Sequence, residues 1–265
     1  MSRPTFPNSA IVQARERLVL RDGSWGSIAL GVRYGLMVHP QFGPVLIDTG
    51  YGPRATRDAR RSLALKLYGA VFRPQLVETD LPLVALQRAG YTAADVQRII
   101  VTHFHVDHVA ALRDFPNAAF ITSGSAWRTI GAMRLFERLR NGIFLELLPP
   151  DFSSRLLPIE TCPERPLPFG LGIGRDLLGD GSCLAVDLPG HAIGHFGVLW
   201  PHAAPPLLYA TDTTWLSDAL DGRLPRGMAE AVYADAGGMR ASAGRVAAFR
   251  KAGGEVVLCH DRVPM

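Results

Sequence analysis

The pattern of hydrophobic and polar positions predicts strands at the start of this chain. Ile11–Leu20 alternates in part and ends at the turn residues Arg21-Asp22-Gly23. Ser27–Val38 is rich in Ile, Leu, Val and Tyr, and the turn Gln41-Phe42-Gly43-Pro44 leads into Val45–Ile47. Apolar runs separated by Gly, Pro and Asp are typical of paired strands. The opening of the chain is therefore predicted to be a meander of antiparallel strands.

Later segments combine helical spacing with short apolar runs. Helices are predicted where apolar residues recur with a helical period, at Ala55–Val71, Leu81–Ala89, Asp107–Phe115, Gly124–Ile130, Met133–Leu148 and Ala241–Lys251. Further strands are predicted at Arg98–Val101, Ala118–Thr122, Leu184–Leu188, Gly197–Trp200, Leu207–Ala210 and Glu255–Cys259. Each half of the chain has strands first and helices after. This order predicts an α+β protein, a sandwich of two sheets with helices outside.

The segment Met133–Leu148 is amphipathic, and the pair Asn141-Gly142 is expected to break it. Its apolar side chains alternate with arginines and glutamate, so one interpretation is a helix packed against the core. The other interpretation is a helical cap over an active site, at residues 131–150.

Composition narrows the class of protein. An apolar fraction of 48% and a charged fraction of 20% are those of a soluble globular protein. The net charge of +4 is too weak to indicate a nucleic-acid partner. The three cysteines form no CxxC pair, which favours a reducing compartment and hence a cytoplasmic location. Residues 1–10 lack the apolar core of a secretory signal.

The segment Leu188–Thr211 contains no charged residue apart from histidine and is long enough to span a bilayer. It also contains four prolines and three glycines, which a membrane helix would not tolerate well. A buried strand-loop-strand segment is predicted instead, with no membrane partner.

A cluster of histidines and aspartate follows the apolar run Arg98–Val101. Its members are His103, His105, Asp107 and His108. Imidazole and carboxylate are the usual donors to a hydrolytic divalent metal. Because this spacing is demanding, the cluster is interpreted as a metal site.

Three later apolar runs also end in His or Asp. His191 follows a strand and a Pro-Gly turn, Asp212 follows Leu208–Thr211, and His260 follows Val256–Cys259. Side chains at strand ends converge on one edge of a sheet, so all three are candidates for the same site. His39, His202 and His195 are set aside, the last as a supporting or loop residue.

Together these motifs resemble the metallo-β-lactamase superfamily. The resemblance rests on Thr-His-x-His-x-Asp-His at 102–108, Pro-Gly-His at 189–191, Thr-Asp at 211–212, His-Asp at 260–261 and Leu-Ile-Asp-Thr-Gly at 46–50. It implies one domain over residues 1–265, an αββα sandwich of two mostly antiparallel sheets with helices on the outer faces. It also implies a site for two divalent metals, zinc being expected and Fe, Mn or Co compatible.

The same resemblance implies a role for each candidate residue. His103, His105 and His191 would hold the first metal. Asp107, His108 and His260 would hold the second, and Asp212 would bridge the two. Asp48 would orient a ligand histidine from behind.

Within the superfamily, the spacing of the motifs resembles the N-acyl-homoserine lactone lactonases. Those enzymes typically have a tyrosine three residues after the bridging aspartate, where this chain has Trp215. They also tend to have glycines soon after the Asp-His pair, where this chain has Val109-Ala110-Ala111. These departures leave the identity of the substrate open.

The expected activity is metal-dependent hydrolysis. Two ions about 3.5 Å apart would hold a bridging hydroxide that attacks an ester or lactone carbonyl, and Asp107 would pass a proton to the leaving group. Asp107 and Asp212 are thus the catalytic candidates, and Phe104, Val106 and Trp215 are candidate substrate contacts. For Phe104 and Val106 inward packing is an equal alternative.

Other functions stay open at this point. A thioesterase of the hydroxyacylglutathione-hydrolase type has nearly the same ligand set, and a phosphotriesterase or nuclease could use the same metals. A metal-binding regulatory protein with little turnover is an alternative from another class. The expected partner is a small ester or lactone rather than nucleic acid, and a homodimer is an open alternative.

Overall fold

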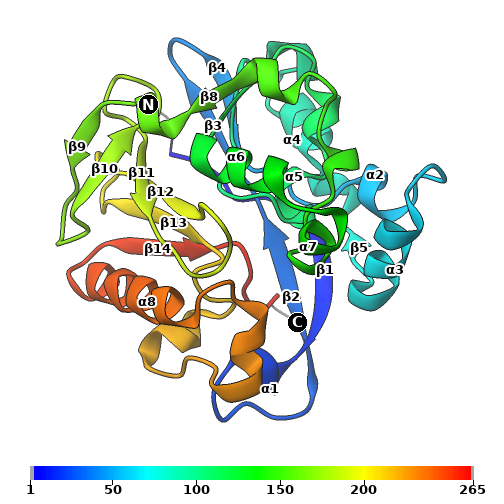
Figure 1. Ribbon diagram of the computed structural model, residues 1–265. Coiled ribbons are helices and arrows are strands. Elements are labelled where there is room, and N and C mark those ends of the chain that lie inside the picture. The colour runs from blue at the N-terminus through cyan, green and yellow to red at the C-terminus, as the bar shows by residue number, and fades with distance from the viewer. Residues whose placement is uncertain (1–2, 264–265) are drawn as a thin grey trace. The chain divides into compact units, whose positions relative to one another are not determined.

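The structure is a computed structural model that describes the backbone of residues 3–263, and the side chains of that range apart from residues 228, 231 and 232. Contacts divide the chain into two compact units. The first unit comprises Met1–Gln13 and Ala29–Leu157, and the second comprises Ala14–Ile28 and Pro158–Met265. Figure 1 follows the chain from blue at its N-terminus to red at its C-terminus.

The first unit is built on a five-stranded sheet with strand order β3-β4-β6-β7-β8. Its strands are β3 (Gly35–His39), β4 (Gly43–Ile47), β6 (Arg98–Ile100), β7 (Ala119–Thr122) and β8 (Leu156–Pro158). β3 and β4 form an antiparallel hairpin, but β4 pairs parallel with β6 and β6 parallel with β7. The antiparallel pairing predicted for the opening of the chain is confirmed for this hairpin. The parallel strands β6 and β7 come later in the chain, after helical crossovers.

A three-stranded sheet contains β1 (Asn8–Arg15), β2 (Ser27–Arg33) and β5 (Gln75–Leu76), in the order β2-β1-β5. The prediction of one strand over Ser27–Val38 was wrong, because β2 and β3 belong to different sheets. Tyr34 lies between them, fully buried, and its hydroxyl donates to the Asp80 carbonyl at 2.9 Å. The bend is thus fixed by a distant contact.

The α-helices of the first unit's described residues are α2 (Pro53–Thr56), α3 (Leu63–Phe72), α4 (Pro82–Arg88), α5 (Val106–Val109), α6 (Gly124–Ala132) and α7 (Leu135–Arg140). They are labelled in Figure 1. The helix predicted over Ala55–Val71 is two helices, because Ser62 caps a new helix by accepting from the Leu65 amide at 3.2 Å. The break predicted at Asn141-Gly142 is confirmed, since α7 ends at Arg140 and only a 3-10 turn, η4 (Leu145–Leu147), follows. The predicted helix at Asp107–Phe115 is also short and ends in the 3-10 turn η3 (Leu112–Asp114).

The second unit is built on a six-stranded sheet with strand order β14-β13-β12-β11-β10-β9. Its strands are β9 (Glu164–Pro166), β10 (Ile173–Asp176), β11 (Leu184–Asp187), β12 (Phe196–Trp200), β13 (Leu207–Thr211) and β14 (Glu255–Leu258). β12 and β13 are fully buried, which confirms the strand-loop-strand prediction for the uncharged segment. α8 (Ala236–Lys251) buries Val246 and Phe249 in the core of this sheet.

The loops that follow β11, β13 and β14 all begin at the same edge of this sheet. β11 is antiparallel to β12, and β12 is antiparallel to β13, so β11 and β13 run the same way. β14 pairs parallel with β13. The carboxyl ends of β11, β13 and β14 therefore lie at the same edge, and each is followed by a candidate ligand.

An early piece of the chain completes the second unit. The short helix α1 (Glu16–Val19) lies within Ala14–Ile28. Just after it, the Arg21 amide donates to the Arg223 carbonyl at 2.9 Å, and the Arg21 side chain donates to the Gly222 carbonyl at 2.6 Å. Residues near the start of the chain are thus fixed to residues some two hundred positions later.

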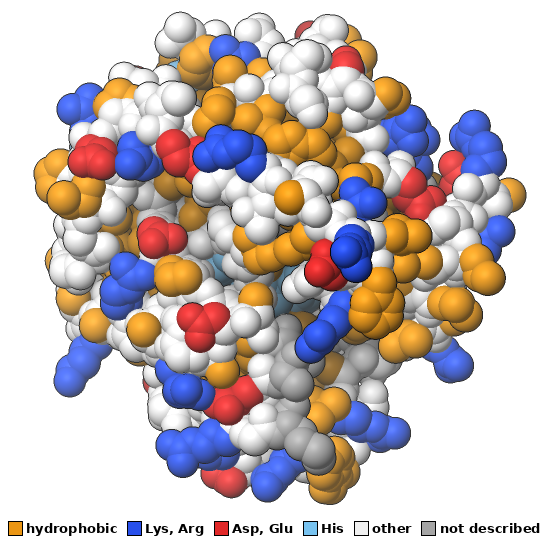
Figure 2. Space-filling view, viewed as in Figure 1, with side chains coloured by type: hydrophobic (Ala, Val, Ile, Leu, Met, Phe, Trp, Pro, Cys, Tyr) orange, Lys and Arg blue, Asp and Glu red, His pale blue; other side chains and the backbone are white. Residues whose placement is uncertain are grey.

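Large apolar side chains reach the surface on α3 and α7. Leu63, Leu67, Val71, Leu135 and Phe136 have between 60% and 75% of their surface exposed. Figure 2 shows hydrophobic side chains gathered on the face of the first unit that carries these helices. Among residues 3–263, no helix has the length and the apolar run needed to cross a bilayer.

Candidate metal centre

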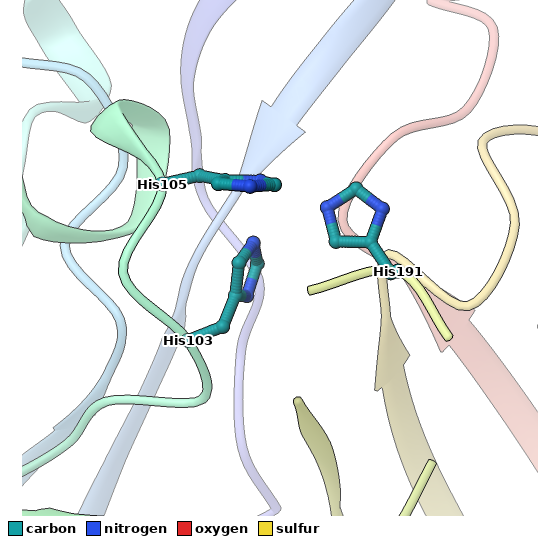
Figure 3. A group of neighbouring side chains, drawn as sticks. All are labelled: His103, His105 and His191. Carbon is teal, nitrogen blue, oxygen red and sulfur yellow. The ribbon is translucent and has the colours of Figure 1, made fainter. Parts of the chain in front are cut away.

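In the first unit the candidate ligands follow β6 directly. His103 and His105 lie in the loop after β6, and Asp107 and His108 lie in α5. Figure 3 shows the rings of His103 and His105 projecting from this loop towards each other, and their centroids are 4.6 Å apart. The rings of His103 and His108 are closer still, at 3.9 Å. The local fold thus brings the imidazole rings of three histidines, within six sequence positions, close together.

Asp48 orients this cluster from the end of β4. The Asp48 amide donates to the Ile100 carbonyl at 2.7 Å, which extends the parallel pairing of β4 and β6. Its carboxylate accepts from the Thr102 amide and hydroxyl, each at 2.8 Å, and lies 2.8 Å from His108 Nδ1. Because Nδ1 is hydrogen-bonded to Asp48, Nε2 is the His108 nitrogen that can coordinate a metal. The predicted supporting role of Asp48 has the hydrogen bonds that it requires.

The residue after Asp48 holds the backbone of α5. The Thr49 amide and hydroxyl donate to the His108 carbonyl at 2.9 and 3.0 Å, and the Thr49 hydroxyl accepts from the Ala111 amide at 3.1 Å. A helix of only four residues has little stability of its own. These bonds to the segment just after β4 therefore fix the helix that carries Asp107 and His108.

In the second unit the candidate ligands gather around Asp212. Its carboxylate oxygen Oδ2 lies 3.3 Å from His191 Nε2 and 3.4 Å from His260 Nε2. His191, which is labelled in Figure 3, comes from the loop after β11, and His260 follows β14. All three side chains are buried. The sequence predicted this convergence from strand ends alone.

The distances around Asp212 test whether a metal fits. With Zn–N and Zn–O bonds of about 2.0–2.2 Å and tetrahedral angles, two ligand atoms on one ion lie about 3.4 Å apart. The two measured distances, 3.3 and 3.4 Å, match that spacing. The donor set of imidazole and carboxylate also suits zinc, iron, manganese or cobalt. These residues therefore fit a divalent metal.

His195, which the sequence set aside, positions Asp212. It is 1% exposed, and its Nδ1 lies 2.6 Å from the Leu188 carbonyl, which makes Nδ1 the donor. Its Nε2 then accepts from the Asp212 amide at 3.4 Å and from the Thr211 hydroxyl. Thr211 has a φ of 46°, a left-handed conformation that a non-glycine residue needs such contacts to keep. No local signal marked His195, since its partners lie on other strands.

Gly190 sets the path of the chain into His191. It has a φ of 127°, and a Cβ there would lie 2.0 Å from the Met239 amide nitrogen. The Asp235 amide donates to the Gly190 carbonyl at 2.9 Å, and the Ala234 amide donates to the His191 carbonyl at 3.1 Å. The start of α8 therefore packs directly on the loop that carries His191.

Two further side chains of the second unit lie next to these ligands. The ring of Tyr233 lies 6.0 Å from that of His191, and burial together with the charge of Asp212 raises the pKa of Tyr233 well above its usual value. Cys259 is fully buried, and its sulfur lies within 4.8 Å of a His260 nitrogen. The sequence analysis assigned neither residue a role.

The candidate substrate contacts divide into two groups. Phe104 is 3% exposed and packs on Trp127 and Phe152, with ring centroids 5.7 and 5.8 Å away, and Val106 is fully buried. Both side chains pack inward, as the alternative interpretation expects, and their contact with a substrate stays a prediction. Trp215 lies with its ring 5.1 Å from that of His260. Its indole nitrogen is buried and has no hydrogen-bond partner among the described residues.

The segment predicted as a cap contacts one candidate ligand. A Cβ added at Gly142 would lie 3.4 Å from His105 Cδ2. The turn that ends α7 therefore packs against the ring of His105. The role of residues 131–150 as a cap over substrate stays a prediction.

Comparison with known proteins identifies the family. The family model described as the metallo-beta-lactamase superfamily matches residues 35–251, and the chain belongs to that superfamily. The probable metallo-hydrolase Rv2300c of Mycobacterium tuberculosis is 31% identical over 191 residues, which cover 71% of this chain and 58% of that protein. The N-acyl homoserine lactonase AttM of Azorhizobium caulinodans is 26% identical over 223 residues, covering 77% of this chain and 75% of AttM. The chain thus spans little more than half the length of its mycobacterial relative.

Solved structures show the same fold. An N-acyl homoserine lactone hydrolase with N-hexanoyl-L-homoserine at its catalytic metal centre superposes with a TM-score of 0.71 at 19% identity, covering 97% of this chain and 92% of the other. The dizinc quorum-quenching lactonase AidC superposes with a TM-score of 0.60 at 19% identity, covering 92% and 76%. These matches confirm the predicted metallo-β-lactamase fold.

Proposed function

We propose that this chain is a hydrolase with two metal ions that cleaves the acyl–oxygen bond of an ester or lactone. The observation that carries the proposal is the geometry around Asp212, where one carboxylate oxygen lies 3.3 and 3.4 Å from two imidazole nitrogens. An oxygen shared between two imidazoles at metal-ligand spacing is expected where a carboxylate bridges two ions. Membership of the superfamily and the likeness to AttM support the proposal.

Each metal would be held by its own set of ligands. His103, His105 and His191 would hold one ion. Asp107 and His108 would share the other ion with His260, and Asp212 would bridge. Asp48 would hold His108 with Nε2 towards its ion, through the 2.8 Å contact to Nδ1.

Divalent ions, when bound, supply Lewis acidity and lower the pKa of water towards neutrality. The protein's own task is then to deliver a proton to the leaving alkoxide. Among its three carboxylates near the ligands, Asp48 is 0% exposed, Asp212 is 1% exposed and Asp107 is 8% exposed. Asp48 is committed to Thr102 and His108. Asp107 is therefore the carboxylate best able to reach a substrate atom and transfer the proton.

Trp215 would supply an orienting group for the substrate. Its indole N–H donates one hydrogen bond and cannot transfer a proton. A buried donor without a partner costs free energy, which a substrate oxygen would recover. Trp215 would thus bind an oxygen of the ester or lactone beside His260.

The experiment is an activity panel on metal-loaded protein, with a lactone, an aryl ester, a lactam, a thioester and a phosphotriester. Lactone or ester hydrolysis should dominate, and Asp107→Asn should lower kcat about 100-fold or more when assayed with enough added metal to fill both sites. Arg128→Gln, an exposed change in α6, should leave the rate unchanged. Near-native turnover by Asp107→Asn with full metal content would contradict the proposed proton transfer.

The same panel separates the remaining functions. Preference for the thioester would favour a thioesterase of the hydroxyacylglutathione-hydrolase type. Preference for the phosphotriester would favour a phosphotriesterase. A protein that binds two metals yet turns over none of the five substrates would favour the regulatory alternative. Trp215→Phe should raise KM for the lactone about tenfold, because it removes the donor and keeps the aromatic ring.

A further inference from the structure

The first unit contains a pocket of about 210 Å³ with an unusual concentration of arginine. We name it the arginine pocket. Its described lining is Arg54, Asp58, Arg60, Arg61, Arg113, Glu146 and Leu147, with no predicted metal ligand among them. The four arginines and two acidic residues give it a formal charge of +2. Like charges gathered in one pocket repel each other unless an anion lies between them.

The two acidic side chains of the pocket are already engaged. The Asp58 carboxylate accepts from the Arg60 amide at 2.9 Å and pairs with the Arg60 guanidinium at 3.3 Å. These bonds lower the pKa of Asp58, so it stays ionised and neutralises Arg60. The Glu146 carboxylate accepts from the Ser62 amide at 2.9 Å and from its hydroxyl. Neither acid forms an ion pair with Arg61 or Arg113 in the described part of the chain.

The other arginines keep unneutralised charge or an unused donor. Arg61 donates to the carbonyls of Asp58 and Ala55 at 2.9 and 3.2 Å, and Arg113 donates to the Glu146 carbonyl at 3.0 Å. Carbonyl oxygens orient a guanidinium group without cancelling its charge. Arg54 pairs with Asp114 through one terminal nitrogen at 3.2 Å. Its Nε is buried and has no hydrogen-bond partner among the described residues.

We propose that the arginine pocket binds a phosphoryl dianion, either free phosphate or the phosphate of a monoester. Arg61 and Arg113 carry two positive charges that no carboxylate of the described residues pairs with, which matches a dianion. Guanidinium groups recognise phosphate oxygens with paired N–H donors. The volume lies below that of pockets for drug-sized ligands, which suits one phosphoryl group rather than a nucleotide. This site is independent of the metal centre and of the proposed hydrolysis.

The position of the pocket suggests what binding would do. Arg113 lies in η3, which follows the ligand-bearing helix α5, and Glu146 lies in η4, within the predicted cap. Arg54 lies in α2, shortly after Asp48. A dianion held by Arg54, Arg61 and Arg113 would therefore tie together three segments that adjoin the candidate ligands of the first unit.

The test is isothermal titration of the metal-loaded protein at constant ionic strength with inorganic phosphate, glycerol phosphate, sulfate and chloride. Saturable phosphate binding is expected, about tenfold or more weaker in Arg113→Gln and in Arg61→Gln, and unchanged in Arg128→Gln. Arg113→Lys, which keeps the charge and loses the paired donors, should bind with intermediate affinity. Equal affinity for the two phosphates supports a free-phosphate site, and tighter binding of glycerol phosphate supports a monoester site.

Two results would overturn the proposal. One is the absence of saturable phosphate binding to the native chain. The other is phosphate binding of equal affinity in Arg113→Gln and Arg128→Gln, because a phosphate bound at the metals would not depend on Arg113. Arg113 is an exposed side chain, so this variant should fold even if Arg61→Gln does not, and thermal melting of each variant checks this.

Discussion

Replacing Asp48 with asparagine removes the group that orients His108 and leaves His108 itself in place. In the native chain the carboxylate accepts from the Thr102 amide and hydroxyl and from His108 Nδ1, each at 2.8 Å. Asparagine has the same size and keeps one accepting oxygen for the Thr102 amide. Its NH₂ group cannot accept from His108 or from the Thr102 hydroxyl. The variant therefore loses two hydrogen bonds at a fully buried site.

The magnitude follows from those two bonds. A hydrogen bond to a charged group contributes about 1.5–3 kcal/mol, and non-additivity brings the expected loss for the pair to about 2–4 kcal/mol in metal-free protein. Loss of the group that orients a ligand histidine lowers metal affinity about 10- to 100-fold. The affinity for one ion should fall more than the affinity for the other, because Asp48 contacts His108 and no other candidate ligand among the described residues.

Two measurements check this prediction. Urea denaturation of metal-free protein gives the loss of stability, and competition with a chelator gives the affinity for each metal. Thr122→Val is the matched control, since Thr122 is buried in β7 and its hydroxyl donates to the Val101 carbonyl at 2.7 Å. The control should lose about 1 kcal/mol of stability with unchanged metal affinity. An Asp48→Asn protein that is destabilised yet binds both metals with native affinity would refute the orienting role.

Three further predictions follow from other contacts. His195→Ala removes the acceptor of the Asp212 amide and should weaken metal binding about tenfold, as measured by the same competition; native affinity would mean that Asp212 holds its position unaided. Gly190→Ala should destabilise the chain by about 3 kcal/mol or more in urea, because the new Cβ would lie 2.0 Å from a backbone nitrogen of α8; a loss below about 1 kcal/mol would contradict this geometry. Hydrogen bonds from Arg262 and Ser24 lower the pKa of Glu16 to about 2, so its stabilisation is complete above pH about 4.5 and disappears as pH falls to about 2. Glu16→Gln should be less stable than native by up to about 1 kcal/mol at pH 7, with the difference vanishing near pH 2; a constant difference across that range would refute the assignment.

The candidate ligands could be predicted because each one follows an apolar run. A buried strand is recognisable from its own residues, and a polar side chain at its end must lie near the sheet edge. This argument identified His191, Asp212 and His260 without any knowledge of pairing. It did not depend on which strands are neighbours.

The features that the sequence did not reveal depend on distant contacts. The split of Ser27–Val38 between two sheets rests on Tyr34 and its bond to the Asp80 carbonyl. No strand was predicted where β9 and β10 lie, because this segment contains two prolines and three glycines. His195 lacked a local motif, because its role comes from the Leu188 carbonyl and the end of β13.

The early segment of the second unit has a consequence for folding kinetics. The bond between Arg21 and the Gly222 carbonyl joins residues 201 positions apart, and closing a flexible loop of that length costs about 5 kcal/mol of chain entropy. Contacts of such high sequence separation form late, and proteins that depend on them fold slowly. During synthesis, residues 14–28 therefore cannot form these contacts until residue 222 has been made and has left the ribosome. Until then Val19 and Leu20, which are buried in the folded chain, stay exposed to solvent, and such exposed apolar side chains favour aggregation.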